Sequence, residues 1–365
     1  MVNRVDRGNF SDWWWTIDHY ILVFCLFLMV FGILLSFSAS PSVAYRIGIT
    51  DAFHFVKLHI KYTCLAFFVM IFSSFCTPRT IHRLCVFILI VSIFLLLLTL
   101  FQGMDIKGAR RWIAVAGIVI QPSEFMKPAF SVTLAWFFMR LQYAYAILLY
   151  LMCSILLTLE PDIGQTILIT LIGLILFFLS GGAWFFIYSF IGFLIIALFS
   201  IYFLFGHVHE RMNSFVTGQG DTFQASVGHK AILHGGWFGQ GPGEGIIKNL
   251  IPDSHTDFVF SVAAEEYGII FCMIIVILFA FIVIRSLLIA MKEENEFLRL
   301  SISGLALLIG FQSVINIAVN LHLMPPKGMT LPFLSYGGSS LLAVSFTTGC
   351  LLALTRRFPK DITVS

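Results

Sequence analysis

Long apolar runs separated by short polar connections make up most of this 365-residue chain. A helix needs about 20 apolar residues to cross the hydrocarbon layer of a bilayer. The pattern predicts ten spanning helices, near residues 18–38, 59–76, 81–101, 123–139, 143–159, 163–180, 184–206, 259–285, 300–322 and 335–355. With 59% of its residues hydrophobic and 11% charged, the chain is expected to be an all-α, polytopic integral membrane protein.

One long polar segment interrupts the pattern between the seventh and eighth predicted spans. Residues 207–258 are rich in Gly, His, amide and acidic side chains. The chain has no internal repeat and no low-complexity linker, so we expect one membrane domain over residues 18–355, with tails at 1–17 and 356–365. A membrane protein with one long loop so dense in reactive side chains is expected to act there.

The distribution of positive charge predicts the orientation in the membrane. Lys and Arg are enriched in short cytoplasmic loops and tails. One side of the predicted topology collects Arg4, Arg7, Arg79, Arg83, Arg140, Arg285, Lys292, Arg299, Arg356, Arg357 and Lys360. Both termini are therefore expected in the cytoplasm and the long loop in the periplasm. The segments 103–122, 160–162 and 324–340 fall on the same outer side as the loop and are expected to form a composite site with it.

Outward cations oppose this topology rule and suggest an anionic ligand. Lys107, Arg110 and Arg111 lie within five residues of one another. The planar donor fork of Arg matches phosphate oxygens, so these side chains can clamp a phosphate or diphosphate. Contact with anionic lipid headgroups, or a surface ion pair, explains them equally well. Arg211 and Lys327 are further outward cations.

Acidic residues near the ends of spans have both structural and functional interpretations. Glu124 and Lys127 are spaced i, i+3, which favours an ion pair on one helix. Glu160 and Asp162 bracket a proline, and capping of the sixth span by Asp162 is the favoured interpretation. The spacing of the His, Cys and acidic residues matches no zinc motif.

Asp257 is the acid with the most functional promise, because it stands at the start of the eighth span. A partly desolvated carboxylate there can act as a general base, whereas an N-cap for the following helix is an equally good interpretation. Glu265 and Glu266 lie further into that span, where acids need partners or a wet cavity. The glycines of 235–245 match no dinucleotide fingerprint and are expected to allow tight turns and close backbone approach to a ligand or to the membrane surface.

Five ordered segments resemble the FtsW/RodA/SpoVE proteins, the SEDS polymerases of the bacterial cell wall. They are GARRWI at 108–113 with QPSEFMK at 121–127, EPDIGQT at 160–166, GWFGQGPGEG at 236–245, IPDSHTDFVF at 251–260 with EEYG at 265–268, and PPKGMTLPFLSYGGSS at 325–340. The resemblance covers nearly the whole chain. Lys327 and the GPGEG run resemble the FtsW-type, division branch. Glu160 departs from the Gln that is common in the family, and residues 226–229 depart from its usual pattern.

This resemblance implies a peptidoglycan glycosyltransferase. The implied substrate is lipid II, a disaccharide-pentapeptide on undecaprenyl diphosphate, polymerised into β-1,4-linked glycan for the septal wall. The essential acid of the family falls on Asp257, the implied general base. The candidate ligands of the diphosphate are Arg110, Arg111, Arg211 and Lys327, and Glu124 and Lys127 are expected to support the substrate cavity. A divalent cation, Mg²⁺ or Mn²⁺, is a candidate cofactor.

The same resemblance implies partners and a location. It implies a class B penicillin-binding protein (FtsI-like), other divisome membrane proteins, surrounding membrane lipids and no nucleic acid. The location would be the bacterial inner membrane at the division septum. Two alternatives remain open, a lipid II flippase and a non-catalytic scaffold that recruits the transpeptidase.

Overall fold

The computed structural model describes residues 9–106, 109–115, 117–182, 192, 223–325 and 328–356. These ranges contain α1 (Asn9–Thr16), α2 (His19–Arg46), α3 (His54–Ser74), α4 (Pro78–Gln102), α5 (Pro122–Met139), α6 (Tyr143–Leu159), α7 (Ile163–Leu179), α10 (Phe223–Gly235), the 3₁₀ turn η1 (Ile247–Leu250), α11 (Val259–Ala290), α12 (Glu296–Asn320) and α13 (Gly338–Leu354). Three short strands are β1 (Met104–Ile106), β2 (Ala109–Val115) and β3 (Ile118–Ile120).

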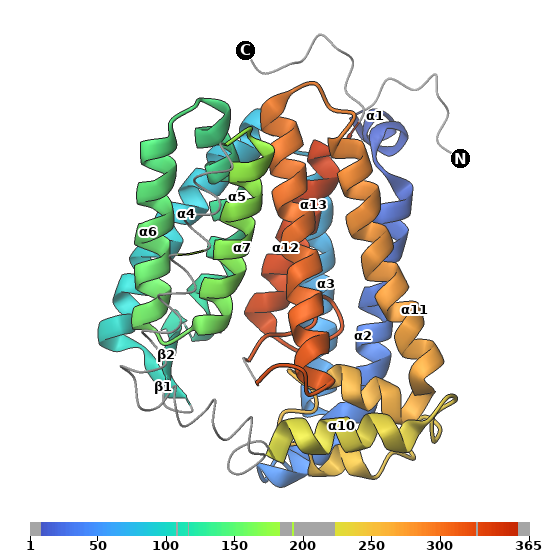
Figure 1. Cartoon of the computed structure of the whole chain (residues 1–365). Coiled ribbons are helices and arrows are strands. Elements are labelled where there is room, and N and C mark those ends of the chain that lie inside the picture. The colour runs from blue at the N-terminus through green and yellow to red at the C-terminus, as the bar shows by residue number, and fades with distance from the viewer. Residues whose placement is uncertain are drawn as a thin grey trace.

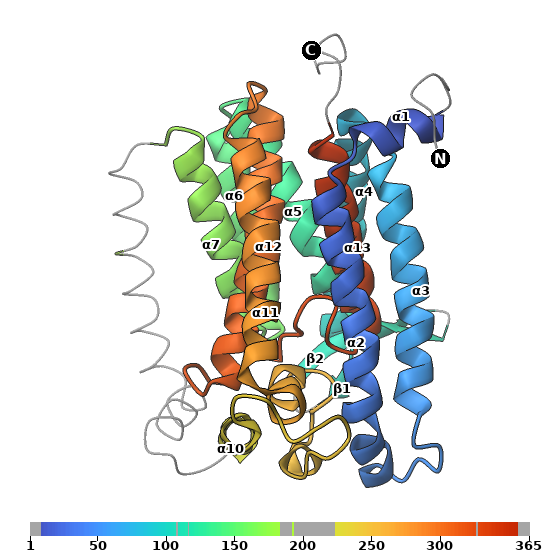
Figure 2. The same cartoon turned by 90° about the vertical axis from the view of Figure 1, so that its right-hand side faces the viewer.

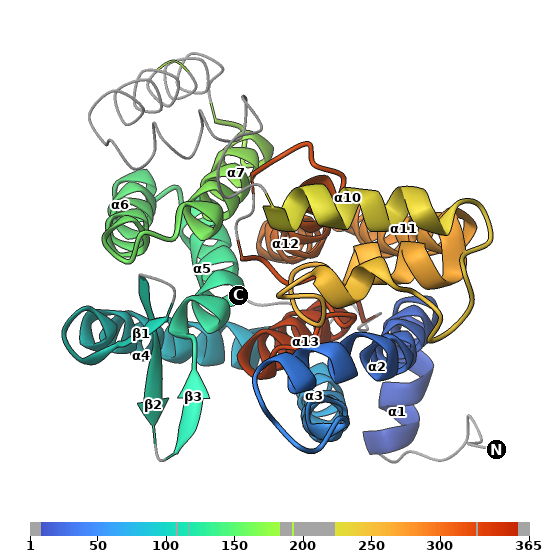
Figure 3. The same ribbon diagram turned by 90° about the horizontal axis from the view of Figure 1, so that it is seen from below.

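The long helices run side by side, and one short helix lies across them. In Figure 1, α4 to α7 form one group, next to a second group made of α2, α3 and α11 to α13. The two groups meet chiefly where α5 and α7 pack on α12 and where α5 packs on α13. The view from below in Figure 3 shows α10 lying over α11 and α12 at one end of the bundle.

Nine of the ten predicted spans coincide with helices, and the seventh, at 184–206, lies outside the described residues. In the part of the chain that is described, α2, α3, α4, α11 and α12 are each long and apolar enough to cross a membrane. The helices α6, α7 and α13 are apolar but shorter. The prediction of a largely helical, polytopic membrane protein is confirmed. The long loop also has structure of its own, since α10 and η1 lie within it.

The segment 103–122 forms a small antiparallel sheet, which the sequence analysis did not predict. The strand order is β1-β2-β3, with Met104 opposite Trp112 and Ile113 opposite Ile120. β3 consists of Ile and Val, and β2 contains Trp112, Ile113 and Val115; β-branched and aromatic side chains of this kind favour extended backbone. Because the strands are only three to seven residues long, their periodicity is too short to identify from the sequence.

The two ends of the described chain meet at the end of the bundle opposite to the sheet and α10 (Figure 2). Arg356, just after α13, donates from Nε to Thr16 Oγ1 at 2.9 Å. On the same end, Arg285 of α11 pairs with Asp18, the N-cap of α2, at 2.7 Å. These contacts fasten the N-terminal helices to the rest of the bundle. Which side of the membrane this end faces stays a prediction.

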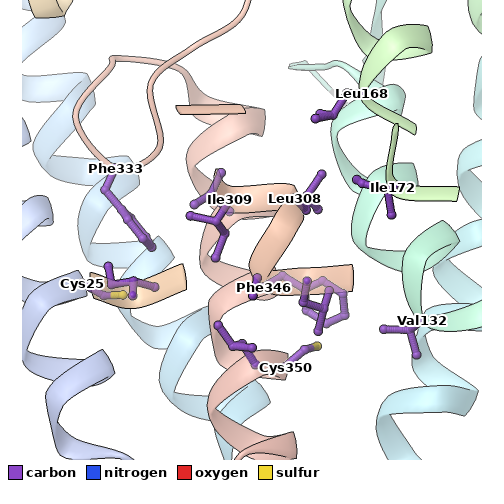
Figure 4. Close-up of a cluster of buried hydrophobic side chains, with 14 of the residues drawn as sticks. Cys25, Val132, Leu168, Ile172, Leu308, Ile309, Phe333, Phe346 and Cys350 are labelled. Carbon is purple, nitrogen blue, oxygen red and sulfur yellow. The ribbon is translucent and has the colours of Figure 1, made fainter. Parts of the chain in front are cut away.

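The core is a continuous apolar interior shared by both helix groups. Figure 4 shows part of it, with Leu308 and Ile309 of α12 near Phe346 and Cys350 of α13. Phe333 joins this core from the loop before α13, and it is 1% exposed. The final outer loop therefore turns back into the bundle. Its main-chain carbonyls at Met329 and Thr330 lie beside buried polar side chains of α12.

Candidate functional site

Asp257 lies in a tight turn directly before α11 and is partly buried. Its N–H donates to the carbonyl of Asp253 at 3.2 Å. The N-cap of α11 is Phe258, which makes no side-chain cap, so Asp257 does not cap the helix as the alternative interpretation required. A Cβ atom added to Gly328 would lie 3.9 Å from Asp257 Oδ2. The carboxylate is therefore next to the backbone of the last outer loop.

Two buried amides of α12 hold the main chain of Asp257. Asn316 and Asn320 each donate from Nδ2 to the carbonyl oxygen of Asp257, both at 2.9 Å. Asn316 Nδ2 also donates to the carbonyl of Met329 at 2.6 Å. The same side chain thus contacts the turn that carries Asp257 and the last outer loop.

A chain of buried polar groups continues from this point into the bundle. Gln312, one turn before Asn316, donates to the carbonyl of Thr330 at 3.1 Å and accepts a hydrogen bond from Lys127 Nζ, also at 3.1 Å. Lys127 pairs with Glu124 at 2.9 Å, and Gln165 of α7 donates to the other oxygen of Glu124 at 2.7 Å. The predicted i, i+3 ion pair is confirmed, and it is almost fully buried.

This polar chain borders a small cavity inside the bundle. The cavity is lined by Glu124, Lys127, Gln312 and Thr347 on its polar side and by Leu308, Ile309, Ala343 and Val344 on its apolar side. A buried cavity with several polar partners is suited to water or to a polar ligand group. The prediction that Glu124 and Lys127 support a substrate cavity stays a prediction, because a cavity this small does not itself accommodate a lipid-linked sugar.

Glu265 and Glu266 hold the outer loop. The carboxylate of Glu265, which is fully buried, accepts the backbone N–H groups of Ile246, Ile247 and Lys248 at 2.7–2.9 Å. Glu266 forms an ion pair with the side chain of Lys248. The partners that these deep acids require are therefore the loop's own backbone, one lysine and His234 of α10, whose Nδ1 lies 3.1 Å from Glu265 Oε1.

The Gly-rich run approaches α11 closely, as expected of glycine, although the surface approached is a helix backbone. The helix is broken at Gly268, where φ is 81° and ψ is 175°. The loop supplies the missing hydrogen bonds: Gln240 N donates to the carbonyl of Glu265 at 2.9 Å, and Ile269 N donates to the carbonyl of Gly236 at 3.0 Å. A Cβ atom at Gly239 would collide with the carbonyl of Glu266.

The two arginines of β2 have different surroundings. Arg111 donates to the carbonyls of Glu160 and Pro161 and lies 3.8 Å from Asp162 Oδ1. Arg110 is exposed on the strand. Lys107, Arg211 and Lys327 lie outside the described residues. The segment around Arg111 is thus held by ionic and hydrogen-bonding contacts, whereas Arg110 faces outward.

The loop between α6 and α7 combines a cap with a perturbed acid. Asp162 is the N-cap of α7 and accepts from Gln165 N at 3.4 Å, as predicted. Glu160 is 1% exposed and accepts a hydrogen bond from Thr99 Oγ1. Burial raises the pKa of Glu160 to about 7, against the opposing effect of the Thr99 hydrogen bond.

Contacts join all four outer elements that the sequence analysis grouped. Arg111 connects the sheet to the α6–α7 loop, and Gln121 N donates to Ser339 Oγ at 3.1 Å, which connects the sheet to the final block. Tyr336 N donates to the carbonyl of His255 at 2.9 Å, which connects the final block to the long loop. The four elements are therefore joined to one another by contacts, and their joint role as a substrate site stays a prediction.

Sequence reasoning missed the amides of α12. Gln312, Asn316 and Asn320 are 0–2% exposed and spaced four residues apart, on one face of the helix. A periodic row of amides within an apolar span was a usable signal, since polar groups inside a membrane helix default to a functional interpretation.

These features define a class of protein: a polytopic membrane protein whose buried polar groups and partly buried acid meet at one end of the bundle. The FtsW/RodA/SpoVE family profile, described as a cell cycle protein, matches residues 18–358. The chain belongs to this family.

Similar proteins are known from several bacteria. A protein of Caulobacter vibrioides named "Probable peptidoglycan glycosyltransferase FtsW" is 45% identical over 364 residues, covering 98% of this chain and 93% of the relative. A protein of Geobacter sulfurreducens with the same name is 35% identical over 360 residues, covering 93% and 95%.

Two solved structures are similar along almost their whole length. One is a chain of a peptidoglycan synthase complex, with a TM-score of 0.78, 26% identity and coverage of 93% of this chain and 97% of that one. The other is the rod shape determining protein RodA of Thermus thermophilus, with a TM-score of 0.67, 26% identity and coverage of 94% and 97%.

Proposed function

We propose that this chain is a peptidoglycan glycosyltransferase of the FtsW type, which polymerises lipid II into β-1,4-linked glycan strands for septal cell-wall synthesis. The observation that carries this proposal is the environment of Asp257 in a chain 45% identical to a protein named as such a transferase. The acid is partly buried, its main chain is held by two amides, and the backbone of the last outer loop lies beside its carboxylate.

In the proposed reaction, Asp257 acts as the general base. Its carboxylate accepts the proton of the acceptor sugar's 4-hydroxyl, and the hydroxyl oxygen attacks the anomeric carbon of the donor sugar. The bond from that carbon to the lipid diphosphate breaks, the diphosphate leaves with the electron pair, and inversion gives the β linkage. A positioned general base contributes about 10²- to 10⁴-fold to the rate.

Cations near the leaving group would stabilise the negative charge that builds on it, which is a large contribution to catalysis in many enzymes. The proposed ligands of the diphosphate are Arg110, Arg111, Arg211 and Lys327. The exposure of Arg110 favours it for direct contact, whereas Arg111 is already bonded to the α6–α7 loop. Lys327 precedes Gly328, the residue beside the Asp257 carboxylate.

The proposed divalent cation has no preformed protein site in the parts of the chain that are described, where no three His, Cys, Asp or Glu side chains are grouped to hold a metal ion. Mg²⁺ commonly binds through substrate phosphates and one or two carboxylates, so metal removal by a chelator is the direct test of a requirement.

The proposed partner is a class B penicillin-binding protein (FtsI-like), which would cross-link the glycan as it forms. The similarity to a chain of a peptidoglycan synthase complex supports a partner of this kind. Other divisome membrane proteins, a septal location in the inner membrane and cytoplasmic termini belong to the same proposal.

The test is glycan synthesis by the purified complex of this chain and its cognate transpeptidase, given labelled lipid II. Moenomycin is included to silence polymerases of other families. Polymer is the expected product. Transfer of labelled lipid II across vesicles without polymer would favour the flippase alternative. Neither activity, together with recruitment of the transpeptidase, would favour the scaffold.

A further inference from the structure

We propose that Asn320 and Asn316 of α12 are positioning residues for the transfer reaction, which set the place of the Asp257 carboxylate by holding its main-chain carbonyl. This inference rests on the proposed function, in which Asp257 is the base. Both amides act on the backbone from which the carboxylate extends.

Asn320 is inserted into a hydrogen bond that a continuous helix would make. If α11 began one turn earlier, Ser261 N would donate directly to the carbonyl of Asp257, four residues before it. Instead Ser261 N donates to Asn320 Oδ1 at 3.1 Å, and Asn320 Nδ2 donates to the Asp257 carbonyl at 2.9 Å. The amide side chain thus takes the place of a peptide group between them and keeps Asp257 outside the helix.

Asn316 adds a second contact to the same carbonyl oxygen and connects it to the last outer loop. Its Nδ2 donates to the carbonyls of Asp257 and Met329 at 2.9 and 2.6 Å. Met329 follows Gly328, the residue whose backbone faces Asp257 Oδ2. One side chain therefore fixes the separation between the carboxylate and the loop beside it.

The two amides are themselves immobilised. Asn316 is 1% exposed and Asn320 is 0% exposed. Asn320 Nδ2 also lies 2.9 Å from the carbonyl of Asn316 and 3.2 Å from its Oδ1, and Ser261 Oγ donates to Asn320 Oδ1 at 2.8 Å. A buried network in which each member has partners is rigid, and a rigid support keeps a catalytic carboxylate in place.

A misplaced base should slow the chemical step more than it weakens substrate binding. A displacement of about 1 Å at a reacting group can cost about 100-fold in rate. We therefore expect loss of the amide donors to lower kcat by about 10- to 100-fold and to leave KM within about threefold of wild type. Substitution of a residue needed only for folding would lower the yield of complex and leave the kcat of the folded complex unchanged.

The test uses the full-length chain in complex with its transpeptidase and lipid II as substrate. Asn316→Asp and Asn320→Asp keep the side-chain size but remove donor hydrogens, and Asn316→Ser and Asn320→Ser are measured in parallel because a buried carboxyl can disturb folding. Ser313→Ala is the matched control, since Ser313 is similarly buried on α12 and its hydroxyl donates to the carbonyl of Ile309 in its own helix.

The expected result is a kcat loss in the Asn variants, a KM close to wild type and wild-type kinetics for Ser313→Ala, each normalised to folded complex. Asn variants with kinetics equal to the control would overturn the inference. So would a failure of all four to form complex, because the amides would then act only in folding. Absence of polymer from the wild type would instead contradict the proposed glycosyltransferase function.

Discussion

Lys248 donates its backbone N–H to the fully buried carboxylate of Glu265 at 2.7 Å, from a position seventeen residues earlier in the chain. Its side chain pairs with the adjacent acid, Glu266. Both acids belong to the start of α11, only two turns beyond Asp257. The turn that carries the proposed base therefore lies between two held segments: the amides of α12 bind its carbonyl, and Glu265 and Glu266 bind the loop just before it.

Glu265→Gln should destabilise the outer loop. An amide has one acceptor oxygen where the carboxylate has two, and its NH₂ group would face backbone donors that then lack partners. Each buried donor left without a partner costs about 1–3 kcal/mol. We expect a lower Tm and faster protease cleavage within 236–250. The exposed Glu244→Gln is the control, and equal behaviour of the two variants would contradict the structural role given to Glu265.

The Glu124–Lys127 pair should show strong coupling. Lys127→Met leaves a buried carboxylate without its cation, a change that costs about 3–5 kcal/mol in comparable pairs. Glu124→Gln in the same chain removes the unpaired charge, and the double variant should recover much of the lost Tm. Thermal unfolding of the purified complex measures both. A double variant no more stable than Lys127→Met would show that the charge is not the cause.

Substitution of Arg110 should weaken substrate binding, whereas substitution of Arg111 should lower stability. Arg110 is exposed, so Arg110→Ala should raise KM for lipid II by about tenfold, equivalent to about 1.4 kcal/mol, and leave Tm unchanged. Arg111 donates to the carbonyls of Glu160 and Pro161, so Arg111→Ala should lower Tm. An Arg110 variant with wild-type KM would remove that side chain from the proposed diphosphate site.

Glu160 should make stability depend on pH. Burial raises its pKa from the ordinary value of 4.5 to about 7, so the folded protein binds this proton more tightly than the unfolded chain. Below about pH 4.5 Glu160 is protonated in both the folded and the unfolded state, so its ionisation does not change the free energy of unfolding. As the pH rises toward about 7, the unfolded chain loses this proton first, and the free energy of unfolding falls. Glu160→Gln stays neutral throughout, so its Tm should exceed that of wild type by a margin that grows over this range. A constant difference in Tm would contradict a titrating, buried Glu160.

The sequence was sufficient to predict features with a local signature. Apolar runs predicted nine helices that the structure contains, because crossing a bilayer requires a long uninterrupted apolar segment. The i, i+3 spacing predicted the pairing of Glu124 with Lys127, and the position of Asp162 before a helix predicted its cap. In the ion pair and in the cap, the two partners lie three residues apart.

Features that depend on distant partners could not be predicted. The hydrogen bonds from Asn320 to Asp257 and from Lys248 to Glu265 join residues 63 and 17 positions apart. Nothing in either local sequence indicates the other. The small sheet was not predicted for a different reason: its strands are too short for an alternation of two residues to be recognised. The roles of Arg211 and Lys327, which lie outside the described residues, stay predictions.

The most direct test of the central claim is glycan synthesis by Asp257→Asn beside wild type, each purified with its transpeptidase and given lipid II in the presence of moenomycin. Asparagine has the same shape as aspartate, and the carbonyl held by Asn316 and Asn320 is unchanged, so the variant should fold and assemble. We predict polymer from wild type and none from Asp257→Asn at equal yield of complex. Equal polymer from both proteins would contradict the account, because Asp257 would then have no part in the chemistry.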